Sequence, residues 1–251
     1  MSRWYSILLP LTGVIALGAI ISCSSDSLPN FSAPLTSTSN SASVSPKSVA
    51  SLKREVNLKK SILKNGRYAR RKFRRLTPRY ITIHSTQNFS TGADAWRHAK
   101  ALHGGKLRGG RIGYMGWHFT VDENVAVQHL PLNEQGDHAD LHGPGNKYSI
   151  GIEMCEHKGN NLSRTIDRTA KLTAVLMVEN RIPLRNVVPH YHWPRKGYSK
   201  PNKNCPHFLL DNGKPGRKWR WFQSRVNTYY RQITTPPSQG DSSANHYASA
   251  R

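Results

Sequence analysis

The chain has 251 residues, a formal net charge of +23 at pH 7 and an apolar content of 37%. Three cysteines are too few for a small fold held together by disulfides, and the low apolar content predicts that part of the chain is not packed into a core. The excess of positive charge indicates an anionic partner, which could be a nucleic acid, an anionic membrane or a cell-wall polymer with carboxylates and phosphates.

The first 22 residues have the features of an export signal. Arg3 precedes an apolar run that closes with Ile20-Ile21-Ser22-Cys23. This ending resembles a bacterial lipobox, so we predict a lipoprotein signal peptide at residues 1–22 and lipidation of Cys23. The alternatives are a plain signal peptide and an uncleaved membrane anchor. A lipidated protein would be exported and held in the cell envelope. Ser24 after the cysteine favours the periplasmic side of the outer membrane if the cell is Gram-negative.

Segments of biased composition flank the predicted domain. Residues 23–52 are rich in Ser, Thr, Pro and Asn, which predicts a flexible tether, and the similar residues 234–251 predict a disordered tail. Residues 53–77 form a basic lead-in, and twelve Lys and Arg lie between positions 53 and 79 against the single acid Glu55. This block predicts attachment to anionic wall polymers or lipid head groups, with a solvated, partly helical segment as the alternative. An exported protein rarely meets nucleic acid, so that partner is disfavoured.

Residues 78–233 carry the patterns of strands and helices. Tyr80–His84 and Ser149–Cys155 alternate apolar and polar residues, as strands do, and residues 117–121 and 125–129 have the pattern of a hairpin. Glu153 shares a strand face with Gly151 and Cys155, which is an unusual place for a carboxylate. Strands that alternate with helices predict an α/β fold, in which a mixed central β-sheet is flanked by helices in a single domain.

Three helices are expected in this domain. The first begins near Thr91 with Asp94 as the acid of a capping box, and buries Trp96, Ala99 and either Leu102 or His103. The second begins after a cap at Asn161 or Ser163 and runs to about Glu179. The third spans about 218–231 and packs an aromatic stripe against the core.

The strongest chemical signal lies in a late loop. His190 and His192 are followed by Lys203 and Cys205, which puts two imidazoles, an ammonium and a thiol in one short segment. Histidine nitrogen and cysteine thiolate are ligands that zinc prefers, and a catalytic zinc usually has three protein ligands. A third ligand would come from elsewhere, and His84 at the end of a strand is the best candidate.

Four motifs occur in a fixed order: Ile81-Thr82-Ile83-His84-Ser85-Thr86, Gly116-Trp117-His118-Phe119, Ser149-Ile150-Gly151-Ile152-Glu153, and Pro189-His190-Tyr191-His192-Trp193 followed by Lys203-Asn204-Cys205-Pro206. Together they resemble the zinc N-acetylmuramoyl-L-alanine amidases of the bacteriophage lysozyme and peptidoglycan-recognition family. The resemblance covers roughly residues 78–212. It implies a catalytic domain that hydrolyses the amide between N-acetylmuramic acid and L-alanine in peptidoglycan.

The resemblance also implies roles for individual residues. A Zn²⁺ ion would be held by His84, His190 and Cys205. Glu153 would act as general base and Lys203 would stabilise the oxyanion. The residues expected to bind substrate are Trp117, His118 and His138.

Several alternatives remain open. His192 and His207 are rival ligands, and Cys205 could instead form a disulfide with Cys155. Residues 194–202 lengthen the spacing between His190 and Cys205 beyond that of close relatives. Some relatives have a tyrosine where this chain has Trp117. A non-catalytic peptidoglycan-binding protein of the same fold is the alternative function.

Overall fold

The computed structural model describes residues 45–109 and 113–234. The predicted signal peptide at 1–22, the lipidation site Cys23, most of the predicted tether and residues 235–251 lie outside the described residues. Within the two described ranges, no helix has both the length and the hydropathy that crossing a membrane requires.

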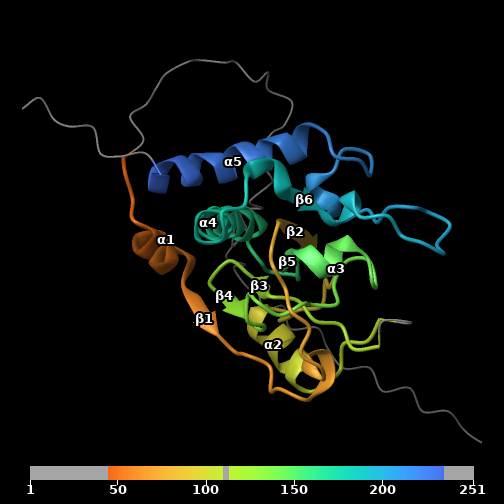
Figure 1. Ribbon diagram of the computed structural model, residues 1–251. Helices are drawn as coiled ribbons and strands as arrows, with labels where there is room; N and C mark the ends of the chain where they lie inside the picture. Colours follow the sequence, from red (N-terminus) through yellow and green to blue (C-terminus); the bar gives the residue numbers. More distant parts are fainter. Residues whose placement is uncertain (1–44, 110–112, 235–251) are drawn as a thin grey trace, which may run out of the picture.

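The centre of the structure is a six-stranded sheet with the strand order β1-β4-β3-β5-β2-β6 (Figure 1). The strands are β1 (Leu58–Lys60), β2 (Tyr80–Ser85), β3 (Phe119–Val121), β4 (Ala126–Gln128), β5 (Ser149–Met154) and β6 (Val187–Pro189). Neighbouring strands are parallel except β3 and β4, which form an antiparallel hairpin. The predicted mixed sheet is therefore confirmed, and the predicted strands and hairpin correspond to β2, β5 and β3–β4.

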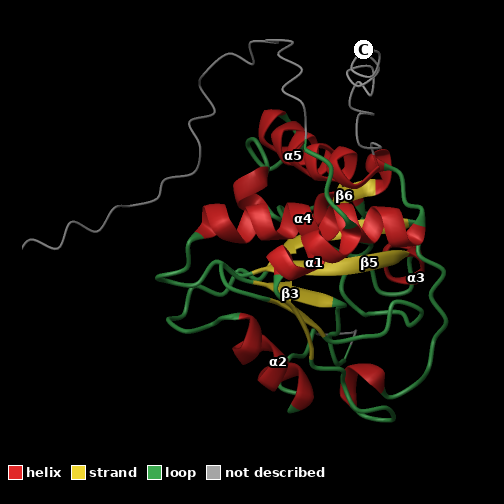
Figure 2. Cartoon of the chain, turned by 90° about the vertical axis from the view of Figure 1, so that its left-hand side faces the viewer, coloured by secondary structure: helices red, strands yellow, loops and turns green. Residues whose placement is uncertain are grey.

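Helices cover both faces of this sheet. They are α1 (Val49–Val56), α2 (Ala95–His103), α3 (Pro144–Tyr148), α4 (Leu162–Asn180) and α5 (Arg217–Thr234). α1, α4 and α5 lie on one side of the sheet and α2 lies on the other (Figure 2). This arrangement agrees with the expected α/β layers.

The two central strands present different side chains to the two layers. β2 and β5 pair in parallel register, so that Ile83 lies beside Ile152 and His84 lies beside Glu153. The isoleucines join the main core with α4 and α5, and each is fully buried. Since successive side chains of a strand point to opposite faces, His84 and Glu153 face the α2 side of the sheet.

The two long helices match their predictions closely. Asn161 caps α4 by accepting a hydrogen bond from the amide of Arg164, as expected for this residue type. α5 begins one residue before the predicted start and ends three residues beyond the predicted end. It buries Trp219, Phe222 and Val226, which confirms that its aromatic stripe packs against the core.

The prediction for α2 is wrong at its start. Asp94 is the cap residue itself and accepts from the amide of Arg97, so the helix begins at Ala95 rather than near Thr91. Trp96 is 48% exposed, whereas His98, Ala99 and Leu102 are buried. The buried stripe consists of Ala95, His98, Ala99 and Leu102, so Trp96 lies outside it and His98 within it.

Residues 53–77 belong to the folded domain, in contrast to the predicted lead-in. Leu52 and Val56 of α1 are fully buried in the main core, which also ends the predicted tether before residue 52. β1 extends the sheet by pairing with β4. Further along, Arg70 pairs with Glu134 and Arg74 pairs with Asp137 at 2.7 Å. The segment is mostly basic, but its few apolar residues at positions 52, 56, 63 and 76 are buried and attach it to the domain.

Candidate metal centre and catalytic site

Three side chains with metal-binding atoms converge at the ends of β2 and β6. His84 is the penultimate residue of β2, His190 follows directly after β6, and Cys205 lies in the loop that returns to the same place. Their ligand atoms all lie within 4.8 Å of one another and all three residues are buried. β6 pairs with β2 in parallel, with Pro189 beside Ile83, so the register brings His190 next to His84. We call these three residues the metal centre.

The hydrogen bonds around the metal centre leave its donor atoms facing inward. Nε2 of His190 lies 2.9 Å from the carbonyl oxygen of Ala139, which can only accept, so Nε2 carries the proton. Nδ1 of His190 therefore presents a lone pair to Nδ1 of His84, 2.9 Å away. The amide of Ser85 donates to Sγ of Cys205 at 3.3 Å.

The charges at the centre suit a divalent cation. Burial, together with the charge of Lys203, lowers the pKa of His190 to about 3, so the imidazole is neutral at physiological pH. Burial and the nearby Glu153 raise the pKa of the Cys205 thiol to about 12. A bound cation would reverse the second effect, because metals favour the thiolate. Two neutral imidazoles and one buried thiol are a donor set that fits Zn²⁺.

Glu153 lies beside the metal centre with an unpaired oxygen. Its Oε1 is 3.8 Å from Nδ1 of His84, and the described part of the chain offers no hydrogen-bond partner to the buried Oε2. Burial raises the pKa of this carboxyl to about 7, against the opposing effect of the Lys203 charge. A carboxyl with a pKa near neutrality is suited to accepting and returning a proton.

The alternative ligands and the alternative disulfide are not supported by the structure. Cys155 and Cys205 are both free thiols, so the alternative of a disulfide between them is wrong. His207 lies at the rim, where Nε2 is 3.3 Å from Glu156. His192 is exposed on a 3₁₀ turn, where its ring meets Trp193 edge to face and lies near the ring of Tyr80. His84, His190 and Cys205 are therefore the cluster that this fold assembles among the described residues.

A family model for N-acetylmuramoyl-L-alanine amidases, Amidase_2, matches residues 74–208. The chain belongs to this family. It is 44% identical over 137 residues to the amidase XlyA of Bacillus subtilis, and 38% identical over 166 residues to the amidase CwlH of the same organism. These matches cover 54% and 65% of this chain and 42% and 57% of the two relatives, so the chain spans about half the length of the curated relatives that it matches.

Solved structures of the amidase family share this fold. A mutant endolysin from Bacillus subtilis aligns with a TM-score of 0.58 at 38% identity, over 68% of this chain and 98% of that chain. The catalytic domain of XlyA aligns with a TM-score of 0.55 at 37% identity, over 68% of this chain and 99% of that chain. The similarity covers nearly the whole of each solved structure.

The three residues predicted to bind substrate are all buried within the amidase domain. Trp117 donates its indole N–H to Thr120 at 2.7 Å. His118 accepts at Nδ1 from the amide of Gly151 and lies with Nε2 2.9 Å from the carbonyl of Glu134. Both ring nitrogens of His138 also face protein atoms. Their contact with substrate stays a prediction, and these positions argue against it.

Sequence reasoning did not identify Asn146 as part of the site. Its Oδ1 accepts from the amides of His138 and Ala139, so it fixes the backbone directly behind His84 and His190. The available signal was Gly151, the small residue on the same strand face as Glu153. A Cβ at position 151 would meet the ring of His138 at 2.8 Å, which shows that the glycine makes room for this ring.

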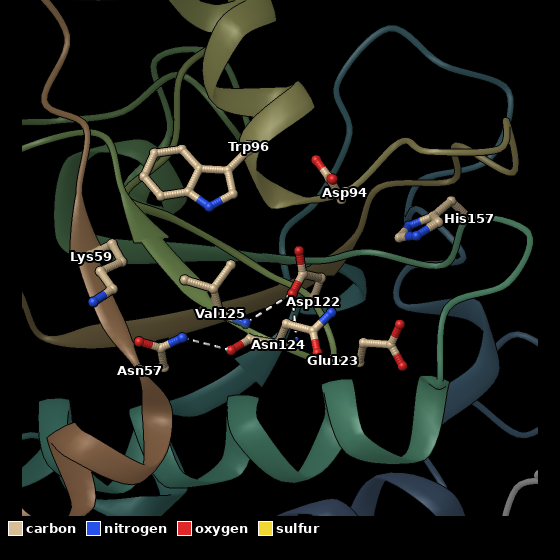
Figure 3. A pocket seen from close by; sticks show the side chains of 9 residues that line it. All are labelled: Asn57, Lys59, Asp94, Trp96, Asp122, Glu123, Asn124, Val125 and His157. Carbon is tan, nitrogen blue, oxygen red and sulfur yellow. Dashed lines mark hydrogen bonds between the residues drawn. The ribbon is translucent and has the colours of Figure 1, made fainter.

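An open pocket of about 300 Å³ lies between α2, the β3–β4 turn and β1 (Figure 3). Its carboxylates accept hydrogen bonds from neighbouring backbone amides. Asp122 accepts from the amides of Asn124, Val125 and Ala95, and Glu123 accepts from the amide of Asn161. None of the metal-centre residues lines this pocket, so it is separate from the catalytic site.

Proposed function

We propose that this chain is a zinc-dependent amidase that hydrolyses the bond between the lactyl group of N-acetylmuramic acid and L-alanine in peptidoglycan. The observation that carries the proposal is the buried convergence of His84, His190 and Cys205 beside a carboxyl with an unpaired oxygen. Membership of the amidase family supports the same reaction.

The protein's own residues divide the chemistry between them. Zn²⁺ held by the metal centre would acidify a water molecule and polarise the scissile carbonyl. Glu153 accepts the proton of the attacking water at its free Oε2 and returns it to the amine of the departing peptide. The ammonium of Lys203 stabilises the negative charge that develops on the carbonyl oxygen. The indole N–H of Trp117 is committed to Thr120, so proton transfer falls to Glu153.

Metal analysis combined with product analysis tests this function. The purified protein should contain one zinc ion, and mass spectrometry of digested peptidoglycan should show lactyl-terminated glycan and peptides that begin with L-alanine. Cys205→Ser and His84→Ala should lose most of the zinc, whereas the control His192→Ala should retain it. A zinc-loaded protein that binds muropeptides but releases no peptide would instead be a peptidoglycan-recognition protein.

We further propose that the chain is exported and anchored in the cell envelope through a lipid on Cys23, on the periplasmic side of the outer membrane in a Gram-negative cell. The basis is the apolar run that closes with Ile20-Ile21-Ser22-Cys23. The wild-type protein should partition into the detergent phase of Triton X-114, and Cys23→Ser should remain in the aqueous phase. Unchanged partitioning of the variant would identify the apolar run as an uncleaved anchor.

The exposed basic residues of the N-terminal segment are proposed to bind anionic wall polymers or lipid head groups. Arg71, Lys72 and Arg75 are exposed, and none of them forms a salt bridge within the described residues. Sedimentation with purified cell walls and with anionic vesicles separates the two ligands. Charge reversal of these three residues should weaken binding in low salt. The same reversal at the exposed Lys214, Arg220 and Arg231 serves as control, and an equal loss there would mean that only net charge matters.

A further inference from the structure

His138 lies directly behind the ligand His84. Its Nδ1 is 3.0 Å from Nε2 of His84, and its own Nε2 is 3.3 Å from the carbonyl oxygen of Ser149. The two rings meet edge to face with their centroids 5.0 Å apart. These contacts form a chain that runs from the backbone of β5, through His138, to the nitrogen of His84 that faces away from the metal centre.

The direction of this chain follows from its two ends. A carbonyl oxygen only accepts, so Nε2 of His138 carries the proton and its Nδ1 is an acceptor. Nε2 of His84 must then donate to it, which leaves the lone pair of His84 on Nδ1, toward the metal centre. His84 is 1% exposed and His138 is 5% exposed, and such burial disfavours the charged form of either ring.

The competing tautomer shows what His138 contributes. With the proton on Nδ1, His84 would donate to Nδ1 of His190, 2.9 Å away, and both lone pairs would be lost to a metal. That arrangement would also turn an unprotonated Nε2 of His138 toward the Ser149 carbonyl, so that two acceptors face each other. The contact with Ser149 therefore favours the tautomer that is ready to bind a cation.

The backbone next to His138 acts on the second histidine. The carbonyl of Ala139 accepts from Nε2 of His190, as described above. The amides of His138 and Ala139 both donate to Oδ1 of Asn146, at 3.0 and 2.7 Å. Asn146 is 1% exposed and touches neither ligand, so it holds the two-residue segment against both histidines at once.

We propose that His138 and Ala139, fixed by Asn146 and by the space above Gly151, position both histidine ligands and set their tautomers for zinc. His138 is thus a positioning residue that acts through His84. The inference rests on the proposed zinc-dependent function. Partners of this kind typically change metal affinity about 10–100-fold when they are removed.

Zinc affinity, measured by competition with a chromogenic chelator on the full chain, tests the proposal. His138→Phe fills the space but offers no acceptor, and should weaken zinc binding about 10–100-fold. His138→Asn places an amide oxygen at the position of Nδ1 and should restore most of the affinity. The control His129→Phe replaces another fully buried histidine, and should lower thermal stability without changing zinc affinity. Equal affinity of wild type and His138→Phe would overturn the positioning role.

Asn146 provides a second variant that touches neither ligand nor metal. Asn146→Ala should weaken zinc binding about tenfold. The control is Asn160→Ala, because Asn160 also accepts two hydrogen bonds, from the amide of Glu123 and the hydroxyl of Thr165, but lies apart from the metal centre. Equal losses in the two variants would mean a general effect of stability and would contradict the proposal.

The tautomer can be read without metal or activity. Long-range ¹H–¹⁵N spectra of the zinc-free protein should show the proton of His84 on Nε2, and His138→Phe should move part of it to Nδ1. A wild-type protein with the proton on Nδ1 would overturn the inference even if it binds zinc. A wild-type protein with the predicted tautomer that binds no zinc would contradict the proposed function instead.

Discussion

The two faces of β2 and β5 differ in what they bury: one is an apolar core face and the other holds the polar residues of the candidate site. On the α4 side the two strands contribute Ile81, Ile83, Ile150, Ile152 and Met154, all fully buried in the main core. On the α2 side the intervening positions hold His84 and Glu153, which are nearly as buried. Burial on the first face stabilises the fold, whereas burial on the second leaves polar atoms that need partners. The comparison indicates that burying His84 and Glu153 on the α2 side costs stability, and that the apolar core on the α4 side offsets this cost.

The largest expected effect is on catalysis, from a substitution on the α2 side of the sheet. Glu153→Gln keeps the shape of the side chain but cannot accept a proton, so amide hydrolysis should fall by about 10²–10⁴-fold. Zinc content and muropeptide binding should be retained. The measurement is the release of L-alanine-terminated peptide at matched zinc occupancy. An unaffected rate would show that another group is the base.

A substitution on the opposite face should give the reverse pattern. Ile152→Ala removes part of a fully buried side chain and should lower the free energy of unfolding by about 2–5 kcal/mol, while Ile152→Val should cost about 1 kcal/mol. Hydrolysis per folded, zinc-loaded molecule should not change in either variant. Chemical denaturation and rate measurements at low temperature check both statements. A rate loss that follows the volume removed would mean that the two faces are mechanically coupled.

The pH dependence of stability tests the cost of burying Glu153. Its pKa is about 7 in the folded zinc-free protein, against 4.5 for the unconstrained side chain. Below pH 4.5 both states hold the proton; between 4.5 and 7 only the folded state does, so stability is lost as the pH rises through this window. Relative to wild type, zinc-free Glu153→Gln should therefore gain of the order of 3 kcal/mol between pH 4.5 and 7. A constant difference between the two unfolding curves would contradict the raised pKa.

The smallest expected effects come from the helix caps, one on each side of the sheet. Asp94→Ala at α2 and Asn161→Ala at α4 each remove a side-chain acceptor from the first turn, and should each cost about 1 kcal/mol of unfolding free energy. Neither variant should alter zinc affinity. Thermal unfolding and chelator competition check both expectations. A selective loss of zinc in Asp94→Ala would show that α2 supports the metal centre.

The central strands and the members of the His84, His190 and Cys205 cluster could be predicted because their signals are local. Alternation along β2 and β5 gives their faces directly, and the histidine and cysteine motifs identify chemistry by residue type. The capping preference of Asn161 likewise gives the start of α4. Residues whose role depends on their own short segment are therefore those that the sequence predicts well.

The remaining errors arose where a long-range contact decides the outcome. The twelve basic residues between 53 and 79 dominate the composition, while Leu52 and Val56 find their partners in α4, more than a hundred residues away. His138 was assigned to substrate through the family resemblance, and only the folded structure shows that Gly151 leaves space for its ring. Trp96 was placed in the core because of its apolar side chain, but the packing of α2 buries Ala95 and His98 instead.

The position of β1 at the edge of the sheet has a consequence for how this domain can be divided. The family match begins at residue 74, after α1 and β1. A fragment that starts there would expose the backbone edge of β4 together with the apolar surface that Leu52 and Val56 cover. Unpaired strand edges can pair with strands of other molecules. In the whole chain the outermost strand is β1, and its exposed Lys59 and Lys60 disfavour such pairing because they are charged. Such a fragment should self-associate, whereas a fragment that keeps α1 and β1 retains the pairing of β4 and the cover over this apolar surface.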